Sequence, residues 1–114
     1  MKQRKVFARV KRTTPPGGMN KTETAYAAQL DFQKHRGEIE AYWYEGIKLK
    51  VNTACFYTPD FMVVTPEEIQ MHEVKGQRRE AGMVRLRTAA HQHRWARFFL
   101  VTKTRGNWVI EEVA

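Results

Sequence analysis

Two short apolar runs separated by a turn form the most informative pattern in the chain, between Tyr57 and Gln77. Residues Phe61–Val64 and Ile69–Val74 are mostly apolar or β-branched, and the segment between them contains Pro66. Short runs of this composition around a brief polar connection are typical of a β-hairpin. The sequence therefore predicts two antiparallel strands here.

Three charged residues lie at the open end of this predicted hairpin, where its first strand begins and its second strand ends. Asp60 precedes the first run, and Glu73 and Lys75 flank Val74 at the end of the second. Because side chains alternate between the faces of a strand, Glu73 and Lys75 should point the same way and His72 the opposite way. Two carboxylates and an ammonium group on one face form a site for a hard divalent cation and a phosphate. A cross-strand salt-bridge ladder is the structural alternative.

A helix is predicted upstream of these strands. Asn20 followed three residues later by Glu23 is the capping-box pattern of a helix N-terminus, and Gly37 is typical of the position after a helix. Apolar residues support a helix that runs to about His35. Glu23 then has two interpretations: it only caps the helix, or it supplies a third carboxylate to the cation from the first turn.

The segment Ile39–Val51 predicts a strand, a tight turn at Glu45-Gly46 and a second strand, together forming another hairpin. In its second strand, positions 47, 49 and 51 are apolar, whereas Lys48 and Lys50 between them are basic. This alternation predicts one buried face and one basic face. The aromatic residues nearby are expected to pack in the core and on the sheet, with stacking on nucleobases as the alternative. They are Tyr42, Trp43, Tyr44, Phe56 and Tyr57.

The C-terminal half predicts a helix and two strands. After a polar, basic loop at 76–82, apolar residues at helical spacing indicate a helix over about Ala81–Trp95. Phe98–Thr102 and Trp108–Val113 are typical of strands, and a helix between two strands permits a right-handed crossover. The expected fold class is α/β (α+β), with a central mixed sheet of four to five strands flanked by helices.

A basic segment precedes this pattern. Residues 1–12 contain six Lys or Arg, and the run Thr-Thr-Pro-Pro-Gly-Gly at 13–18 interrupts regular structure. We therefore expect a basic N-terminal arm and hinge over 1–18 and a single domain over 19–114. The arm is either a solvated extension, a contact to nucleic-acid backbone or a segment that swaps between protomers.

Composition narrows the class of partner. The 114 residues carry a formal net charge of +8, which is typical of a protein with a polyanionic partner, most often nucleic acid. No apolar run approaches the roughly 18 residues of a transmembrane helix, and no apolar signal segment follows the charged N-terminus. The single cysteine, Cys55, fits a reducing compartment. The expected location is the cytoplasm of a bacterium or of a phage-infected host, without a membrane partner.

The central residues resemble the PD-(D/E)xK signature of the restriction-endonuclease-like superfamily. Pro59-Asp60 and Glu73-Val74-Lys75 match that signature. The helix with Glu23 upstream and the Arg-bearing helix downstream are similar to the αβββαβ core of the superfamily. The resemblance covers about residues 19–102.

Local runs are also similar to a family of small phage-encoded endonucleases, and relatives in the superfamily include Holliday-junction resolvases. These runs are Lys21–Ala27, Tyr57–Phe61 and Glu73–Gly76. The resemblance implies a metal-dependent endodeoxyribonuclease that hydrolyses phosphodiester bonds.

The resemblance also implies a role for each matched residue. Asp60, Glu73 and the carbonyl of Val74 would hold magnesium, for which manganese substitutes, with one or two ions per site. Glu23 would complete the metal shell directly or through water. Lys75 would orient or activate the attacking water and stabilise the charge of the transition state, and such positive charge supplies much of the rate of phosphodiester hydrolysis.

A second set of residues is predicted to contact the DNA backbone, with solvated surface charge as the alternative. This set is Lys48, Lys50, Arg78, Arg79, Arg85 and Arg87. Gln77, two residues beyond Lys75, is an additional candidate for the site itself. Phosphate contacts position DNA without reading its sequence, so we expect structure-dependent or weakly sequence-specific activity, with branched DNA among the substrates.

Four questions stay open at the level of sequence. Two symmetric cuts in a DNA junction would require a homodimer, which the sequence does not specify. A non-catalytic DNA-binding or recombination accessory protein that keeps the nuclease fold is the alternative function. The preferred form of DNA and the biological pathway are also open.

Overall fold

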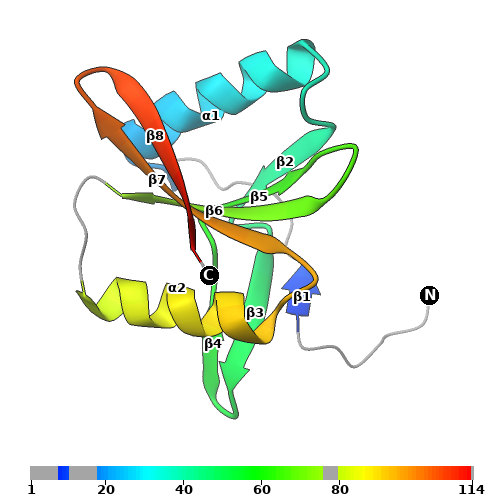
Figure 1. Cartoon of the computed structure of the whole chain (residues 1–114), viewed down its shortest axis with the longest axis vertical. Coiled ribbons are helices and arrows are strands. Elements are labelled where there is room, and N and C mark those ends of the chain that lie inside the picture. Colours follow the sequence, from blue (N-terminus) through cyan, green and yellow to red (C-terminus); the bar gives the residue numbers. More distant parts are fainter. Residues whose placement is uncertain (1–7, 11–17, 76–79, 114) are drawn as a thin grey trace.

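The computed structural model describes residues 8–10, 18–75 and 80–113, which form two helices and two β-sheets. In chain order the elements are β1 (Ala8–Val10), α1 (Lys21–His35), β2 (Ala41–Tyr44), β3 (Ile47–Asn52), β4 (Cys55–Tyr57), β5 (Phe61–Val64), β6 (Ile69–Lys75), α2 (Glu80–Gln92), β7 (Arg97–Thr104) and β8 (Asn107–Val113). Figure 1 shows α1 above the larger sheet and α2 below it.

The larger sheet has five strands in the order β2-β5-β6-β7-β8. The first three pair antiparallel, and the β5–β6 hairpin has Phe61 opposite His72 and Val64 opposite Ile69. Helix α2 then connects β6 to the parallel strand β7, and β8 returns antiparallel to β7. This arrangement confirms the predicted mixed sheet flanked by helices and the predicted hairpin around Pro66.

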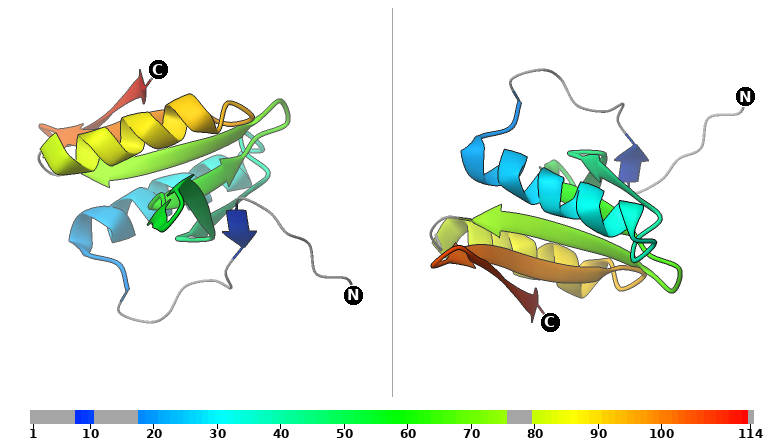
Figure 2. Two further views of the ribbon diagram at one scale, coloured as in Figure 1. Left: turned by 90° about the horizontal axis from the view of Figure 1, so that it is seen from below. Right: turned by 90° about the horizontal axis from the view of Figure 1, so that it is seen from above.

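Helix α1 covers one face of this sheet. It begins with the predicted capping box, because the Asn20 side chain accepts from the Glu23 N–H and the Glu23 side chain accepts from the Asn20 N–H. Its buried residues Glu23, Tyr26, Ala27 and Leu30 recur at the spacing of one helical face. The three apolar ones pack with Phe61, Val63, Val74 and Val101 of the sheet, and Figure 2 shows α1 crossing the sheet on that side.

The opposite face carries α2 together with a smaller sheet of order β1-β3-β4. The inward residues of β3, at positions 47, 49 and 51, pack with Leu86 and Ala89 of α2 and with Met71 of β6. The predicted alternation of a buried and a basic face in β3 is therefore confirmed. The larger sheet thus lies between two apolar cores, one beneath α1 and one beneath α2 and the small sheet (Figures 1 and 2).

The predicted hairpin at Glu45-Gly46 is wrong. Strand β2 pairs with β5, whereas β3 pairs with β1 and β4, so the two strands belong to different sheets. The physical reason is that Tyr44 is buried in the core beneath α1 and Ile47 in the core beneath α2. The chain crosses between the cores at Glu45, whose φ of 49° is left-handed and whose N–H donates to the Asp60 carbonyl at 2.8 Å.

The predicted N-terminal arm lies only partly within the described residues. Residues Ala8–Val10 of the expected arm pair with Ile47–Leu49 of β3, and the rest of residues 1–17 lies outside the described part of the chain. The boundary between an arm and a domain stays a prediction. Within the described residues, neither helix is long and apolar enough to cross a membrane.

Gly46 allows the chain to pass close to Trp43. A Cβ atom built on Gly46 would lie 2.5 Å from the Trp43 Cβ, a contact that the stiff base of that side chain cannot relieve. We expect Gly46→Ala to lower the free energy of unfolding by about 1–3 kcal/mol, the usual cost of overpacking. Urea unfolding measures this change.

Gly82→Ala is the matched control, because a Cβ on Gly82 meets only the end of the Lys75 side chain, at 3.9 Å. Alanine is also preferred over glycine within a helix by about 1 kcal/mol. A Gly46→Ala variant as stable as Gly82→Ala would show that the crossing between the two cores tolerates a side chain.

Candidate functional site

Asp60 lies at the start of β5 and is held by two hydrogen bonds. Its main-chain carbonyl accepts from Glu45, and its side-chain Oδ2 accepts from the Val74 N–H at 2.8 Å. The main-chain pairing of β5 with β6 ends at Phe61 and His72. The Asp60 carboxylate therefore accepts from the next N–H of β6 that faces β5, which is that of Val74. Since the N–H and C=O of a strand residue point to the same neighbour, the Val74 carbonyl faces Asp60 as well.

Glu73 and Lys75 share the other side of the same strand end. The Lys75 Nζ lies 3.1 Å from the Glu73 Oε2, which confirms that the two side chains point the same way. His72 points to the opposite face, as predicted, where its Nδ1 bonds the Tyr26 hydroxyl at 2.6 Å. The Lys75 ammonium group also lies beside Gly82 in the first turn of α2.

Tyr57 is a site residue that the sequence did not reveal. It is buried in β4, and its hydroxyl donates a hydrogen bond to the Glu73 Oε1. Glu73 is therefore held by Tyr57 on one oxygen and by Lys75 on the other. A buried tyrosine needs a partner for its hydroxyl, but the sequence does not show that the packing of β4 brings this hydroxyl to Glu73 of β6.

The site concentrates negative charge in a partly buried position. Burial raises the pKa of Asp60 to about 8, and the negative charges of Glu73 and, to a lesser extent, Glu23 add to this effect. The Val74 N–H and the Lys75 charge act in the opposite direction. Burial and the nearby Glu73 also raise the pKa of Tyr57 well above its ordinary value, so its hydroxyl stays protonated as a donor.

Glu23 caps α1, as one of the two interpretations predicted, and it also contacts Tyr44. Its Oε1 accepts from the Asn20 N–H at 3.0 Å, which is the capping bond, and from the Tyr44 hydroxyl at 2.9 Å. The side chain is only 8% exposed, and its charge still acts on Asp60. The cap is confirmed, and a role in holding a cation stays a prediction.

The predicted DNA-contacting residues occupy two surfaces. Lys48 and Lys50 are exposed on the outer face of β3, and Arg85 and Arg87 are exposed on α2. Arg85 lies near Tyr57, because its positive charge acts to lower the pKa of Tyr57, against the stronger effects that raise it. Arg78, Arg79 and Gln77 lie outside the described residues.

None of the family models, curated proteins or solved structures compared with this chain matches it. Within the described ranges, no group of three or more His, Cys, Asp or Glu residues is arranged to hold a metal ion. A cation at this site would therefore be held by the two carboxylates of Asp60 and Glu73, a backbone oxygen and water. Such a set fits Mg²⁺, which prefers oxygen ligands and retains several waters.

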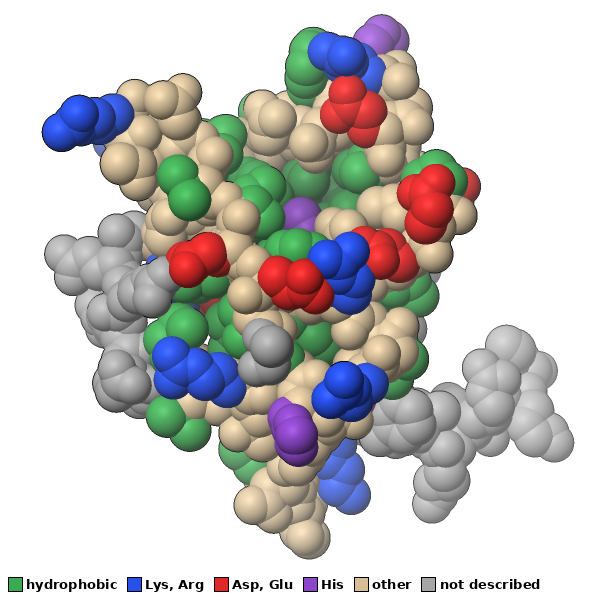
Figure 3. All heavy atoms as spheres, in the orientation of Figure 1, with side chains coloured by type: hydrophobic (Ala, Val, Ile, Leu, Met, Phe, Trp, Pro, Cys, Tyr) green, Lys and Arg blue, Asp and Glu red, His purple; other side chains and the backbone are tan. Residues whose placement is uncertain are grey.

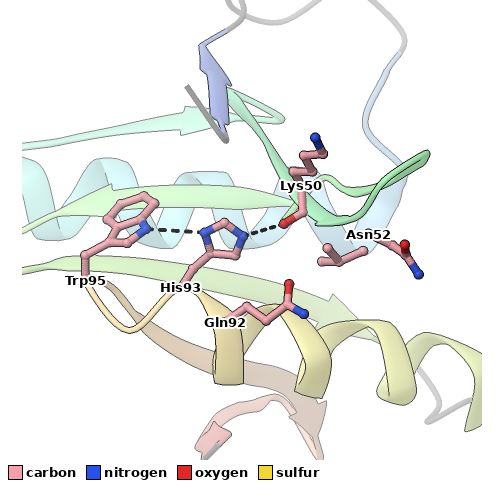
Figure 4. Close-up of a pocket in the computed structure, with 6 residues that line it drawn as sticks. Lys50, Asn52, Gln92, His93 and Trp95 are labelled. Carbon is pink, nitrogen blue, oxygen red and sulfur yellow. Dashed lines mark hydrogen bonds between the residues drawn. The ribbon is translucent and has the colours of Figure 1, made fainter. Parts of the chain in front are cut away.

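A cavity of about 400 Å³ lies at the other end of α2 and is lined by Lys50, Val51, Asn52, Gln92, His93 and Trp95. Figure 4 shows His93 held between two of these residues. Its Nε2 lies 2.7 Å from the Lys50 carbonyl and therefore carries the proton, so its Nδ1 accepts from the Trp95 Nε1 at 3.3 Å. These bonds fix the orientation of the His93 ring, and none of the residues that line the cavity belongs to the carboxylate site.

The raised pKa of Asp60 predicts a dependence of stability on pH. The pKa of Asp60 is about 8 in the folded chain and about 3.9 in an unfolded chain, so the folded state holds the proton between these values. The contribution of Asp60 to stability is present below about pH 4 and is lost as pH rises to about 8.

Asp60→Asn keeps an acceptor for the Val74 N–H and removes the titration. We expect the stability of the wild type relative to this variant to fall across the window by up to about 1.4 kcal/mol per pH unit. Urea unfolding between pH 4 and 9 in EDTA measures it, with the exposed Glu67→Gln as the control for loss of one charge. A difference that is flat or rises with pH contradicts the assignment.

Proposed function

We propose that this chain is a metal-dependent DNA endonuclease with a restriction-endonuclease-like core. The observation that carries the proposal is the hydrogen bond from the Val74 N–H to Asp60, which joins the two halves of the Pro59-Asp60 and Glu73-Val74-Lys75 pattern. Support also comes from the element order. With β3 and β4 taken as an insertion, the chain from α1 to β7 follows the order αβββαβ.

The oxygen atoms of the site fit a hard divalent cation. Asp60, Glu73 and the Val74 carbonyl would hold Mg²⁺ or Mn²⁺, with Glu23 linked through water. The raised pKa of Asp60 supports this assignment, because it reflects burial of the carboxyl group and, after that, the nearby charges of Glu73 and Glu23, and a bound cation would offset these effects. Bound there, the ion would neutralise phosphate oxygens and lower the pKa of a water molecule near the scissile phosphate.

The side chains of this chain perform the remaining tasks. The Lys75 side chain is 32% exposed, so its ammonium group is accessible to a phosphate while its partner Glu73 is nearly buried. Positive charge fixed there stabilises the charge that develops on the phosphoryl oxygens during hydrolysis. Tyr57 keeps Glu73 oriented through its hydroxyl, and Arg85 adds positive charge beside the site.

Nicking assays on linear and branched DNA with Mg²⁺ test the activity. Asp60→Ala should abolish cleavage, and Lys75→Ala should lower the rate by about 10²–10³-fold, as is typical for loss of one preorganised group. Lys34→Ala is the control, because Lys34 is an exposed lysine at the end of α1 remote from Glu23.

The outcomes separate the proposed functions. No cleavage of any DNA by the wild type would favour a DNA-binding or recombination accessory protein. Cleavage that survives both Asp60→Ala and Lys75→Ala would place the activity elsewhere in the sample.

Metal binding can be tested without catalysis. An ion that binds only the folded site stabilises it, by about 2.7 kcal/mol at a concentration of 100 times Kd. We expect Mg²⁺ to raise the thermal unfolding midpoint of the wild type and to have little effect on Glu73→Gln. Glu38→Gln should respond like the wild type, because Glu38 forms an exposed pair with Arg36 at 3.1 Å. If Mg²⁺ raises the unfolding midpoint equally in both variants, Glu73 does not bind the ion.

A further inference from the structure

The outer face of the small sheet combines an exposed aromatic ring with lysines. The inward residues of β3 are buried, so Lys48 and Lys50 point outward. Phe56 of β4 is the register partner of Lys50 and shares that outward face, where it is 43% exposed. Of the two predicted modes of packing, Phe56 therefore adopts packing on the sheet, whereas its neighbour Tyr57 is buried in the core.

The β3–β4 hairpin and the part of α2 that follows Ala81 contain basic residues and no acidic ones. Residues 47–57 and 82–95 contain no Asp or Glu. Their Lys and Arg residues are Lys48, Lys50, Arg85, Arg87 and Arg94. Figure 3 shows the same segregation on one face, since the described acidic side chains lie in its upper and middle parts, above the region of α2 and the β3–β4 hairpin. A polyanion is therefore the partner that complements this region.

The ring of Phe56 gives that polyanion a second point of recognition. The Lys48 Nζ lies 5.5 Å from the ring centroid, so a nucleotide whose base contacts the exposed part of the ring would have its phosphate near an ammonium group. Aromatic rings beside basic side chains are the usual means by which proteins bind single-stranded nucleic acid. A uniform duplex does not present its base faces in this way.

The position of β4 links this face to the carboxylate site. Phe56 and Tyr57 are consecutive residues on opposite faces of the strand, and Tyr57 donates to Glu73. Strand β4 is also an edge of the small sheet. A nucleic-acid strand that crosses this edge would pass from Phe56 towards Asp60.

We propose that the outer face of β3 and β4 binds an unpaired segment of a DNA strand, with a base stacked on Phe56 and phosphates on Lys48 and Lys50. The identification of DNA rests on the proposed nuclease function. The preferred substrate is then DNA with a single-stranded region beside the cleavage point, such as a flap, a branch or a free single strand.

Fluorescence anisotropy in EDTA tests binding without cleavage. The probes are a labelled oligothymidine of about 20 nucleotides, longer than the site sizes common for such surfaces, and the duplex that contains it. We expect the wild type to bind the single strand more tightly. Phe56→Ala should weaken that binding about 10-fold, the order found for loss of one stacked base, with less than about a twofold effect on the duplex. Phe56→Trp should retain the affinity.

Phe32→Ala is the matched control. Phe32 is 53% exposed and has the Arg36 guanidinium 5.4 Å from its ring, but it lies on α1 between Asp31 and the Arg36–Glu38 pair. The Phe32→Ala variant should bind both probes with the affinity of the wild type. In addition, Lys48→Ala should reduce the slope of log affinity against log salt by about 0.7, the value for one lost phosphate contact on a single strand.

The results distinguish this proposal from the nuclease proposal. Equal losses on single strand and duplex in Phe56→Ala, or no loss on either, would overturn the stacking proposal even if the protein cleaves DNA. A selective loss on the single strand, absent in Phe32→Ala, would support it even if no cleavage is found.

Discussion

A single hydrogen bond, from the Val74 N–H to the Asp60 carboxylate, determines how the site is built. It lets a side chain continue the β5–β6 ladder by one step after the main-chain pairing ends. The result places the acidic group of Asp60 against the strand segment that carries Glu73 and Lys75. This proximity is electrostatically unfavourable, and it persists because an N–H, an ammonium group and the Tyr57 hydroxyl offset part of the negative charge.

This bond lies at the end of β6, which explains how charged residues from both faces of the sheet come close to Asp60. Glu73 and Lys75 lie on the face covered by α2 and the small sheet, whereas Glu23 belongs to α1 on the other face. In the middle of the sheet the strands would separate these groups. At the end of the β5–β6 ladder Asp60 is exposed to charges from both sides, which is why Glu73 and Glu23 both raise its pKa.

The parts of this arrangement that follow from local rules could be predicted from the sequence. The capping box fixes the start of α1. Strand alternation places Glu73 and Lys75 on one face of β6 and His72 on the opposite face. The choice between β5 and β3 as partner of β2 depends on which core buries Tyr44 and which buries Ile47, and this is a property of the packed chain. The turn signal at Glu45-Gly46 is the same in either case, because it reports only a local change of direction. The role of Tyr57 does not follow from local rules for a similar reason, since it depends on the packing that brings β4 to Glu73 of β6.

In β4, the consecutive residues Phe56 and Tyr57 point to opposite faces of the strand and would have different roles. The buried Tyr57 orients a carboxylate that would hold the metal, and the exposed Phe56 lies on the same face as Lys48 and Lys50. If both proposals hold, a bound strand and a correctly oriented Glu73 depend on the same short segment. Displacement of β4 would then weaken DNA binding and misalign the carboxylate together. Under these two proposals, this coupling would favour cleavage of DNA that occupies the outer face of the small sheet, and it would give the separate sheet formed by β1, β3 and β4 a role in substrate selection rather than in stability alone.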